Sequence, residues 1–165
     1  LMKELRDQTQ LAVHLSILEG THIVFINNIQ SNGTFTSNIG LGTRWPAHAT
    51  VIGQMMLADL SETEIRDRYK NFNQWDTFSE LTPKNFKELL QRLSFVKTQR
   101  SMVSWGHYNH DMAACAAPIF KQSTHQMAAV LSVSCPLGSY DEHYFRNEIA
   151  DTVIQSADKI SKFIY

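Results

Sequence analysis

The 165-residue sequence has few cysteines and no long apolar run. Its two cysteines, Cys115 and Cys135, are too few for the disulfide framework of a small secreted domain, and both lie in apolar stretches typical of strands. We therefore expect two buried free thiols in a cytoplasmic protein. No apolar run approaches the roughly 18 residues of a membrane span. Charged residues from Lys3 to Asp7 interrupt the N-terminus, so we expect no signal peptide there.

The sequence also lacks an excess of either charge. Lysine and arginine number 15 against 16 aspartates and glutamates, which gives a net charge of −1. Domains that bind nucleic acid usually carry a basic excess or a basic stripe. The only basic cluster, residues 66–70, has acidic residues on both sides. We therefore do not expect this chain itself to bind DNA.

Motifs of the common enzyme classes are absent. The sequence contains no Gly-x-Ser-x-Gly nucleophile motif, and no basic neighbour stands beside either cysteine to activate its thiol. Gly40-Leu41-Gly42 lacks the later glycine and the lysine of a nucleotide-binding loop. Most of the 7 glycines fall in expected turns. We expect neither an enzyme nor a cofactor.

Hydrophobic periodicity divides the chain into helices and strands. Ser61 and Glu64 match a capping box at the start of one helix, and Thr82 is expected to cap another that begins at Pro83. Neighbouring strands with helices at both ends and in the middle predict an α+β fold, an antiparallel sheet with helices packed on it. The expected elements are the end of a helix over residues 1–10, helices over 48–58, from 61, over 83–99 and 145–164, strands over 11–18, 23–29, 102–105, 112–120 and 126–134, and a short extended segment over 34–39.

The segment from Gly106 to Asp111 carries the densest set of metal-ligand residue types. His107, His110 and Asp111 are all residue types that bind transition metals. In a strand, however, residues three apart point to opposite faces, so the two histidines would converge only in a turn. A metal site and a polar hairpin tip both remain open interpretations.

Trp45 and His48 are candidates for a ligand pocket. His48 stands at the start of an expected buried helix, where free backbone amides and the helix dipole favour an anion. The alternative is a core histidine bonded to a backbone carbonyl. Trp45 follows the flexible segment Gly40-Leu41-Gly42 and is either a core residue or the wall of a ligand site.

Ser132 and Ser134 are the third candidate feature. Two residues apart on a strand, they share one face, and Val130, Leu131 and Val133 surround them. Buried hydroxyls need hydrogen-bond partners. Those partners are either the protein's own backbone or water, or a carboxylate or hydroxyl of a ligand.

Three segments, in this order and spacing, resemble the C-terminal effector-binding domain of IclR-type transcriptional regulators, and the resemblance runs over nearly the whole chain. The segments are Gly42-Thr43-Arg44-Trp45-Pro46-Ala47-His48-Ala49-Thr50-Val51-Ile52-Gly53 continuing to Leu57-Ala58, then Ala116-Ala117-Pro118-Ile119-Phe120, then Ala128-Ala129-Val130-Leu131-Ser132-Val133-Ser134.

The resemblance implies a single domain over residues 1–165 with a GAF-like, profilin-like antiparallel sheet flanked by helices. It implies that an N-terminal winged helix-turn-helix domain, joined through the helix at Leu1, is missing from this chain and makes the DNA contacts. The absence of an initiator methionine fits that expectation. It also implies a homodimer or homotetramer and a small-molecule effector, in this family typically a carboxylate.

Carried over by the resemblance, the effector pocket involves backbone amides of Val51 and Ile52 for the anionic end and hydrogen bonds from Ser132 and Ser134. The full implied set is Ser37, Trp45, Val51, Ile52, Ser104, Ala114, Ser132 and Ser134.

The sequence departs from the family pattern at several positions. His107 stands where an acidic residue is frequent, Asp111 where glycine is frequent, and Gln54 where lysine is common. Ser104 and Ala114 replace more reactive or charged residues of some members. We therefore expect an effector different from the familiar ones.

Three functional hypotheses follow. The first is a sensor that binds an organic acid and shifts DNA binding by the absent domain. The second is an assembly-only domain whose pocket is blocked by the bulk of Trp45, Val51 and Ile52. The third is metal sensing through His107, His110 and Asp111.

Overall fold

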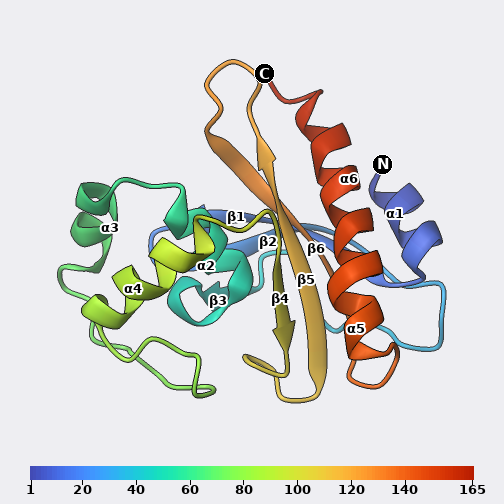
Figure 1. Cartoon of the computed structure of the whole chain (residues 1–165), viewed down its shortest axis with the longest axis horizontal. Coiled ribbons are helices and arrows are strands. Elements are labelled where there is room, and N and C mark those ends of the chain that lie inside the picture. Colours follow the sequence, from blue (N-terminus) through green and yellow to red (C-terminus); the bar gives the residue numbers. More distant parts are fainter.

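The computed structural model describes residues 1–165 and has a central six-stranded antiparallel sheet with helices on both faces (Figure 1). The strand order is β3-β2-β1-β6-β5-β4, so the N-terminal and C-terminal hairpins meet at the centre. This arrangement confirms the predicted α+β class. The strands are β1 (Ala12–Glu19), β2 (His22–Ile29), β3 (Arg44–Pro46), β4 (Met102–Trp105), β5 (Met112–Phe120) and β6 (Met127–Pro136).

The helices form two groups on opposite sides of the sheet. In Figure 1, α1 and α6 lie along one side, and α2, α3 and α4 lie on the other. None of the helices is both long and apolar enough to cross a membrane. The helices are α1 (Met2–Thr9), α2 (Val51–Ala58), α3 (Glu62–Tyr69), α4 (Phe86–Val96), α5 (Glu142–Tyr144) and α6 (Ala150–Ser161), with a 3-10 turn η1 (Ala47–Ala49) and a π-helical turn η2 (Phe145–Ile149).

Alternation along β6 gives the two faces of the sheet different chemistry. Leu131, Val133 and Cys135 belong to the apolar cluster that packs against α1 and α6. Ser132 and Ser134 alternate with them and therefore point to the opposite face. Each fully buried Val or Leu side chain contributes about 1.5–3 kcal/mol, so burying the apolar face fixes which way the serines point.

Helix α2 is buried along its whole length, as its apolar sequence predicts. It begins at Val51, later than expected, because Thr50 is its N-cap: the Thr50 hydroxyl accepts a hydrogen bond from the Gly53 N–H at 3.1 Å. His48 therefore lies in the preceding turn η1 and not in the helix.

The predicted start of the fourth helix at Pro83 is wrong. The Thr82 hydroxyl accepts hydrogen bonds from the Phe78 and Ser79 N–H groups, so it holds the preceding turn. Helix α4 begins at Phe86, where the Asn85 side chain caps the Glu88 N–H at 2.9 Å, and it ends at Val96. The capping box of Ser61 and Glu64 at α3 is confirmed.

The extended segment over residues 34–39 forms no strand of the sheet. The Gln30 side chain bonds both the N–H and the carbonyl of Ser37, and the Asn28 side chain donates to the Ile39 carbonyl. Side chains thus satisfy the backbone groups that a strand would pair. The sixth strand is instead β3, whose three residues pair with the start of β2.

The remaining strand and helix predictions agree closely with the structure. Strands β4 and β5 have the predicted bounds, and both hairpins form. The closing helical segment runs from α5 through η2 to Ser161, so Ile164 lies beyond its end. Cys115 and Cys135 are buried free thiols, as predicted.

Candidate ligand-binding site

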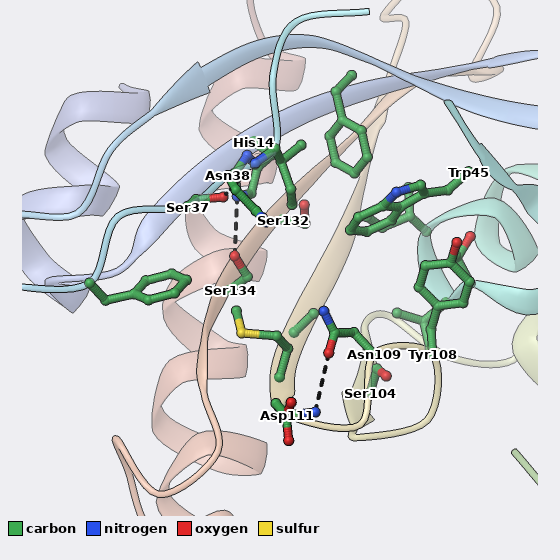
Figure 2. A pocket seen from close by; sticks show the side chains of 18 of the residues that line it. His14, Ser37, Asn38, Trp45, Ser104, Tyr108, Asn109, Asp111, Ser132 and Ser134 are labelled. Atoms are coloured by element: carbon green, nitrogen blue, oxygen red, sulfur yellow. Dashed lines mark hydrogen bonds between the residues drawn. The ribbon is translucent and has the colours of Figure 1, made fainter. Parts of the chain in front are cut away.

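A cavity of about 280 Å³ lies between the serine-bearing face of the sheet, the start of α2 and two loops (Figure 2). The loops contribute residues 35–39 and Tyr108, Asn109 and Asp111. The structure brings together all of the residues implied as the effector pocket. Those lining residues are Ser37, Trp45, Val51, Ile52, Ser104, Ala114, Ser132 and Ser134.

The floor of the cavity is a row of small and polar side chains across four strands. Register pairs Ser104 with Ala114, Ala114 with Ser134, and His14 with Ser132, so β4, β5, β6 and β1 each contribute. The alanine and serine side chains are small, which leaves space between the sheet and α2. Sheet pairing therefore creates the cavity floor.

His14 is the floor residue that the sequence interpretation missed. Its imidazole is almost completely buried, and Nε2 lies 3.1 Å from the Ser134 hydroxyl oxygen. Its Nδ1 atom is buried without a partner. Burial lowers the pKa of His14 to about 4, so the ring is neutral near neutral pH. The available signal was a histidine placed within a strand of otherwise mostly apolar residues.

Aromatic side chains form the wall opposite the serines. Figure 2 shows Trp45 and Tyr108 on one side of the cavity, and His14, Ser132 and Ser134 on the other. The Trp45 ring meets the edge of Phe25 with centroids 4.8 Å apart and lies 5.0 Å from the Tyr108 ring. Burial raises the pKa of the Tyr108 hydroxyl. These contacts hold Trp45 at the wall, where it leaves the cavity open.

The start of α2 contributes backbone donors. The first helical hydrogen bond runs from the Gln54 N–H to the Thr50 carbonyl, and the Thr50 hydroxyl accepts a hydrogen bond from the Gly53 N–H. The N–H groups of Val51 and Ile52 precede these bonds, and both residues line the cavity. Together with the positive end of the helix dipole, they favour a negatively charged group.

The charges around the cavity are few. No lysine or arginine lines it, and Asp111 is its only lining residue that is charged at neutral pH. The Asp111 N–H bonds the Asn109 side chain at 3.2 Å, which orders the loop at that end of the cavity. A ligand with two or more negative charges would therefore find no counter-charge, whereas a single carboxylate can be held by amides and hydroxyls.

His48 lies outside this cavity, so its interpretation as a pocket residue is wrong. Its Nε2 atom lies 3.3 Å from the Asp76 carbonyl oxygen. Its ring packs edge-on against Phe72 and Trp75, at 5.4 and 5.3 Å between centroids. The side chain is fully buried, and burial lowers its pKa. His48 is a core histidine.

His107, His110 and Asp111 lie in the turn between β4 and β5. No group of three or more histidine, cysteine, aspartate or glutamate side chains in the structure is placed to hold a metal ion. His110 is exposed, whereas Asp111 belongs to the cavity lining. The hairpin-tip interpretation therefore fits this loop, and the metal-site interpretation does not.

Comparison with known proteins identifies the family. Residues 1–162 match the sequence profile described as "Bacterial transcriptional regulator IclR C-terminal". The chain belongs to the IclR family. Its relatives include the HTH-type transcriptional regulator XynR of Escherichia coli (strain K12), 27% identical over 146 residues that cover 88% of this chain and 57% of that protein. This IclR-family chain spans about half the length of the curated relatives it matches. Those relatives are named as regulators of transcription, which agrees with the expectation of a regulatory protein.

Solved IclR-family structures share the fold. The C-terminal domain of the E. coli regulator KdgR superposes with a TM-score of 0.81 at 26% identity, covering 98% of this chain and 92% of that one. A double mutant of the inducer-binding domain of PobR from Acinetobacter, described as a complex with 3-hydroxybenzoic acid, superposes with a TM-score of 0.86 at 17% identity, covering 99% of this chain and 94% of that one. The predicted sheet with flanking helices is the architecture of this family.

Proposed function

We propose that this chain is the sensor domain of an IclR-type regulator and that its cavity binds a small organic acid with one carboxylate. One observation carries the proposal. A single cavity combines the free amides of Val51 and Ile52, the serine floor and the aromatic wall of Trp45, with no cationic side chain. This combination suits a monoanion whose body is flat or apolar.

The dimensions of the cavity support a small effector. A volume of about 280 Å³ lies just below the usual range of ligand pockets, about 300–1,000 Å³. The carboxylate of the effector would accept hydrogen bonds from the amides at the start of α2. Ser132 and Ser134 would form hydrogen bonds with the remaining oxygens of the effector. The relative PobR is described with a hydroxylated aromatic acid, which is one member of this class.

The regulatory part of the proposal extends beyond this chain. We propose that a DNA-binding helix-turn-helix domain precedes α1 and that the protein works as a homodimer or homotetramer. Relatives that are longer than this chain and are named HTH-type regulators support the presence of the DNA-binding domain. The effector acts by binding two states of the assembly with different affinity, since equal affinity shifts no equilibrium.

The open cavity favours sensing over an assembly-only role. The side chains of Trp45, Val51 and Ile52 line the space without filling it. An inert assembly domain would have no need for a buried polar floor at this point, because burying polar groups costs free energy unless they are hydrogen-bonded.

A thermal-shift screen with 2-keto acids, sugar acids and hydroxybenzoic acids tests the proposal. At about 100 times Kd, a ligand adds roughly 2.7 kcal/mol of stability, which raises Tm by several degrees in a chain of this size. The matched control is the Ser132→Ala/Ser134→Ala variant, which we expect to lose most of the shift. A flat response of the unchanged chain across the whole panel contradicts the proposal.

A further inference from the structure

His14 is a buried polar residue of the cavity floor that the proposed function leaves without a role. It comes from β1, while its hydrogen-bond partner Ser134 comes from β6, 120 positions later. The ring is held in place by an edge contact with Phe25, with centroids 5.6 Å apart and planes at 77°. Burial is the cause of its lowered pKa.

The unpartnered Nδ1 atom decides where the single proton of the neutral ring lies. A neutral imidazole has one N–H donor and one acceptor nitrogen. A proton on Nδ1 would be a buried donor without an acceptor, which is rarer and less favourable in folded proteins than an under-used acceptor. A proton on Nε2 is therefore favoured, and it would then be donated to the Ser134 oxygen 3.1 Å away.

This assignment fixes the direction of the Ser134 hydroxyl. Its oxygen already accepts a hydrogen bond from His14, so its own hydrogen is free to point elsewhere. Ser134 lines the cavity, and its neighbours on the floor, Ala114 and Ser132, leave the space above it open. The available direction for its hydrogen is the cavity.

We infer that His14 is a positioning residue that commits the Ser134 hydroxyl to donating into the cavity, so that this end of the site selects an acceptor oxygen on the effector. The inference rests on the proposed function, because it names the group that recognises the bound acid. The partner oxygen belongs to a carboxylate, a carbonyl or a hydroxyl. Ser132 lies opposite His14 but makes no hydrogen bond to it, so its hydroxyl can both donate and accept.

The first test needs no ligand. In the chain labelled with ¹⁵N-histidine, long-range nitrogen–proton correlation distinguishes a protonated ring nitrogen from an unprotonated one. We expect His14 to show a protonated Nε2 and an unprotonated Nδ1 near neutral pH, with the signal assigned by its loss in His14→Gln. The opposite pattern overturns the inference whether or not any acid binds.

The second test is a double-mutant cycle measured by calorimetry, with sodium pyruvate and 3-hydroxybenzoate as the starting probes. We expect Ser134→Ala and His14→Phe each to weaken binding by about fivefold, the effect of one hydrogen bond. Because His14 acts through Ser134, the double variant should bind no more weakly than Ser134→Ala alone. His14→Gln keeps an N–H for Ser134 and should restore affinity to within about twofold of the unchanged chain.

The matched control for the cycle is Ser132→Ala, on the same strand and the same face. Ser132 lies opposite His14 across the strands but makes no hydrogen bond to it, so the affinity loss of Ser132→Ala should combine with that of His14→Phe more nearly multiplicatively than the loss of Ser134→Ala does. If the fold-losses of affinity caused by His14→Phe and Ser134→Ala multiply in the double variant, the inference is overturned. If no acid of the panel binds the unchanged chain, the proposed function fails and the effector part of the inference fails with it, while the nitrogen–proton correlation still decides whether His14 donates to Ser134.

Discussion

The Cα atom of Gly53 lies directly against the backbone of Ala47, where helix α2 passes the turn η1. A methyl group built on Gly53 would stand 2.7 Å from the Ala47 carbonyl carbon and closer still to its Cα and carbonyl oxygen. Backbone atoms cannot move aside like the end of a side chain. This close contact between the Gly53 and Ala47 backbones fixes the position of the start of α2 over the cavity.

We therefore expect Gly53→Ala to destabilise the chain by about 3 kcal/mol or more, as overpacking against backbone does. Chemical denaturation measures the change. The matched control is Gly33→Ala, where a methyl would meet nothing within 4 Å and where φ is not positive, so its effect should stay within about 0.5 kcal/mol. Equal stability of the two variants would show that α2 can shift away from η1.

Trp45 should report ligand binding through its fluorescence. Of the three tryptophans, Trp45 lines the cavity, Trp75 packs against Tyr69 and Phe72, and Trp105 packs against Phe145. Filling the cavity changes the polarity around one indole only. Titration with the acid that gives the largest thermal shift should change the emission of the unchanged chain. The change should disappear in Trp45→Phe and persist in Trp105→Phe; its persistence in Trp45→Phe would place the ligand elsewhere.

His14 should make the folded state sensitive to mild acid. Its pKa is about 4 in the folded chain against an ordinary value of 6.5, so between these values the unfolded chain binds the proton more readily. The contribution of His14 to the free energy of unfolding is therefore fully present above about pH 6.5, and it is lost as the pH falls toward 4. The size of the loss is roughly 3 kcal/mol.

Urea denaturation of the unchanged chain and of His14→Phe near neutral pH and near pH 4 measures this contribution. We expect the variant to lose roughly 3 kcal/mol less than the unchanged chain over that interval, since phenylalanine takes up no proton. Parallel pH profiles of the two proteins would mean that His14 titrates normally in the folded state.

The loop between β4 and β5 should not bind a metal ion. Because no metal-holding cluster exists in the structure, replacing both His107 and His110 with alanine should leave zinc content unchanged. His110 is exposed, so its substitution should change stability by no more than about 0.5 kcal/mol. A zinc-dependent rise in Tm that the double variant loses would restore the metal-site hypothesis.

Some of the fold was predictable because the hydrophobic pattern is strong and local. The bounds of β4 and β5 follow from short apolar runs between turns, and α3 follows from the capping box of Ser61 and Glu64. The start of α4 was mispredicted because Thr82 and Asn85 are both good N-cap residues. Only the structure shows that the Thr82 hydroxyl is already used by the preceding turn.

The candidate site was predictable in part. The positions of Trp45, Val51, Ser132 and Ser134 follow from the resemblance to the family, and all four line the cavity. His14 carried no comparable signal, since a histidine in a strand is an ordinary occurrence. Its partnership with Ser134 requires β1 to pair with β6, which no short-range pattern encodes.

The sequence by itself determined the helices, most strands, and which side chains of β6 alternate between apolar and polar, because these depend on neighbours only a few residues apart. Tertiary structure alone decided that β3 exists, that His48 is a core residue, and that His14 meets Ser134. Each of these depends on pairing between distant segments, where register and side-chain competition for hydrogen bonds select one arrangement. The cavity has the same origin: it is the space left when small residues from four strands align beneath α2.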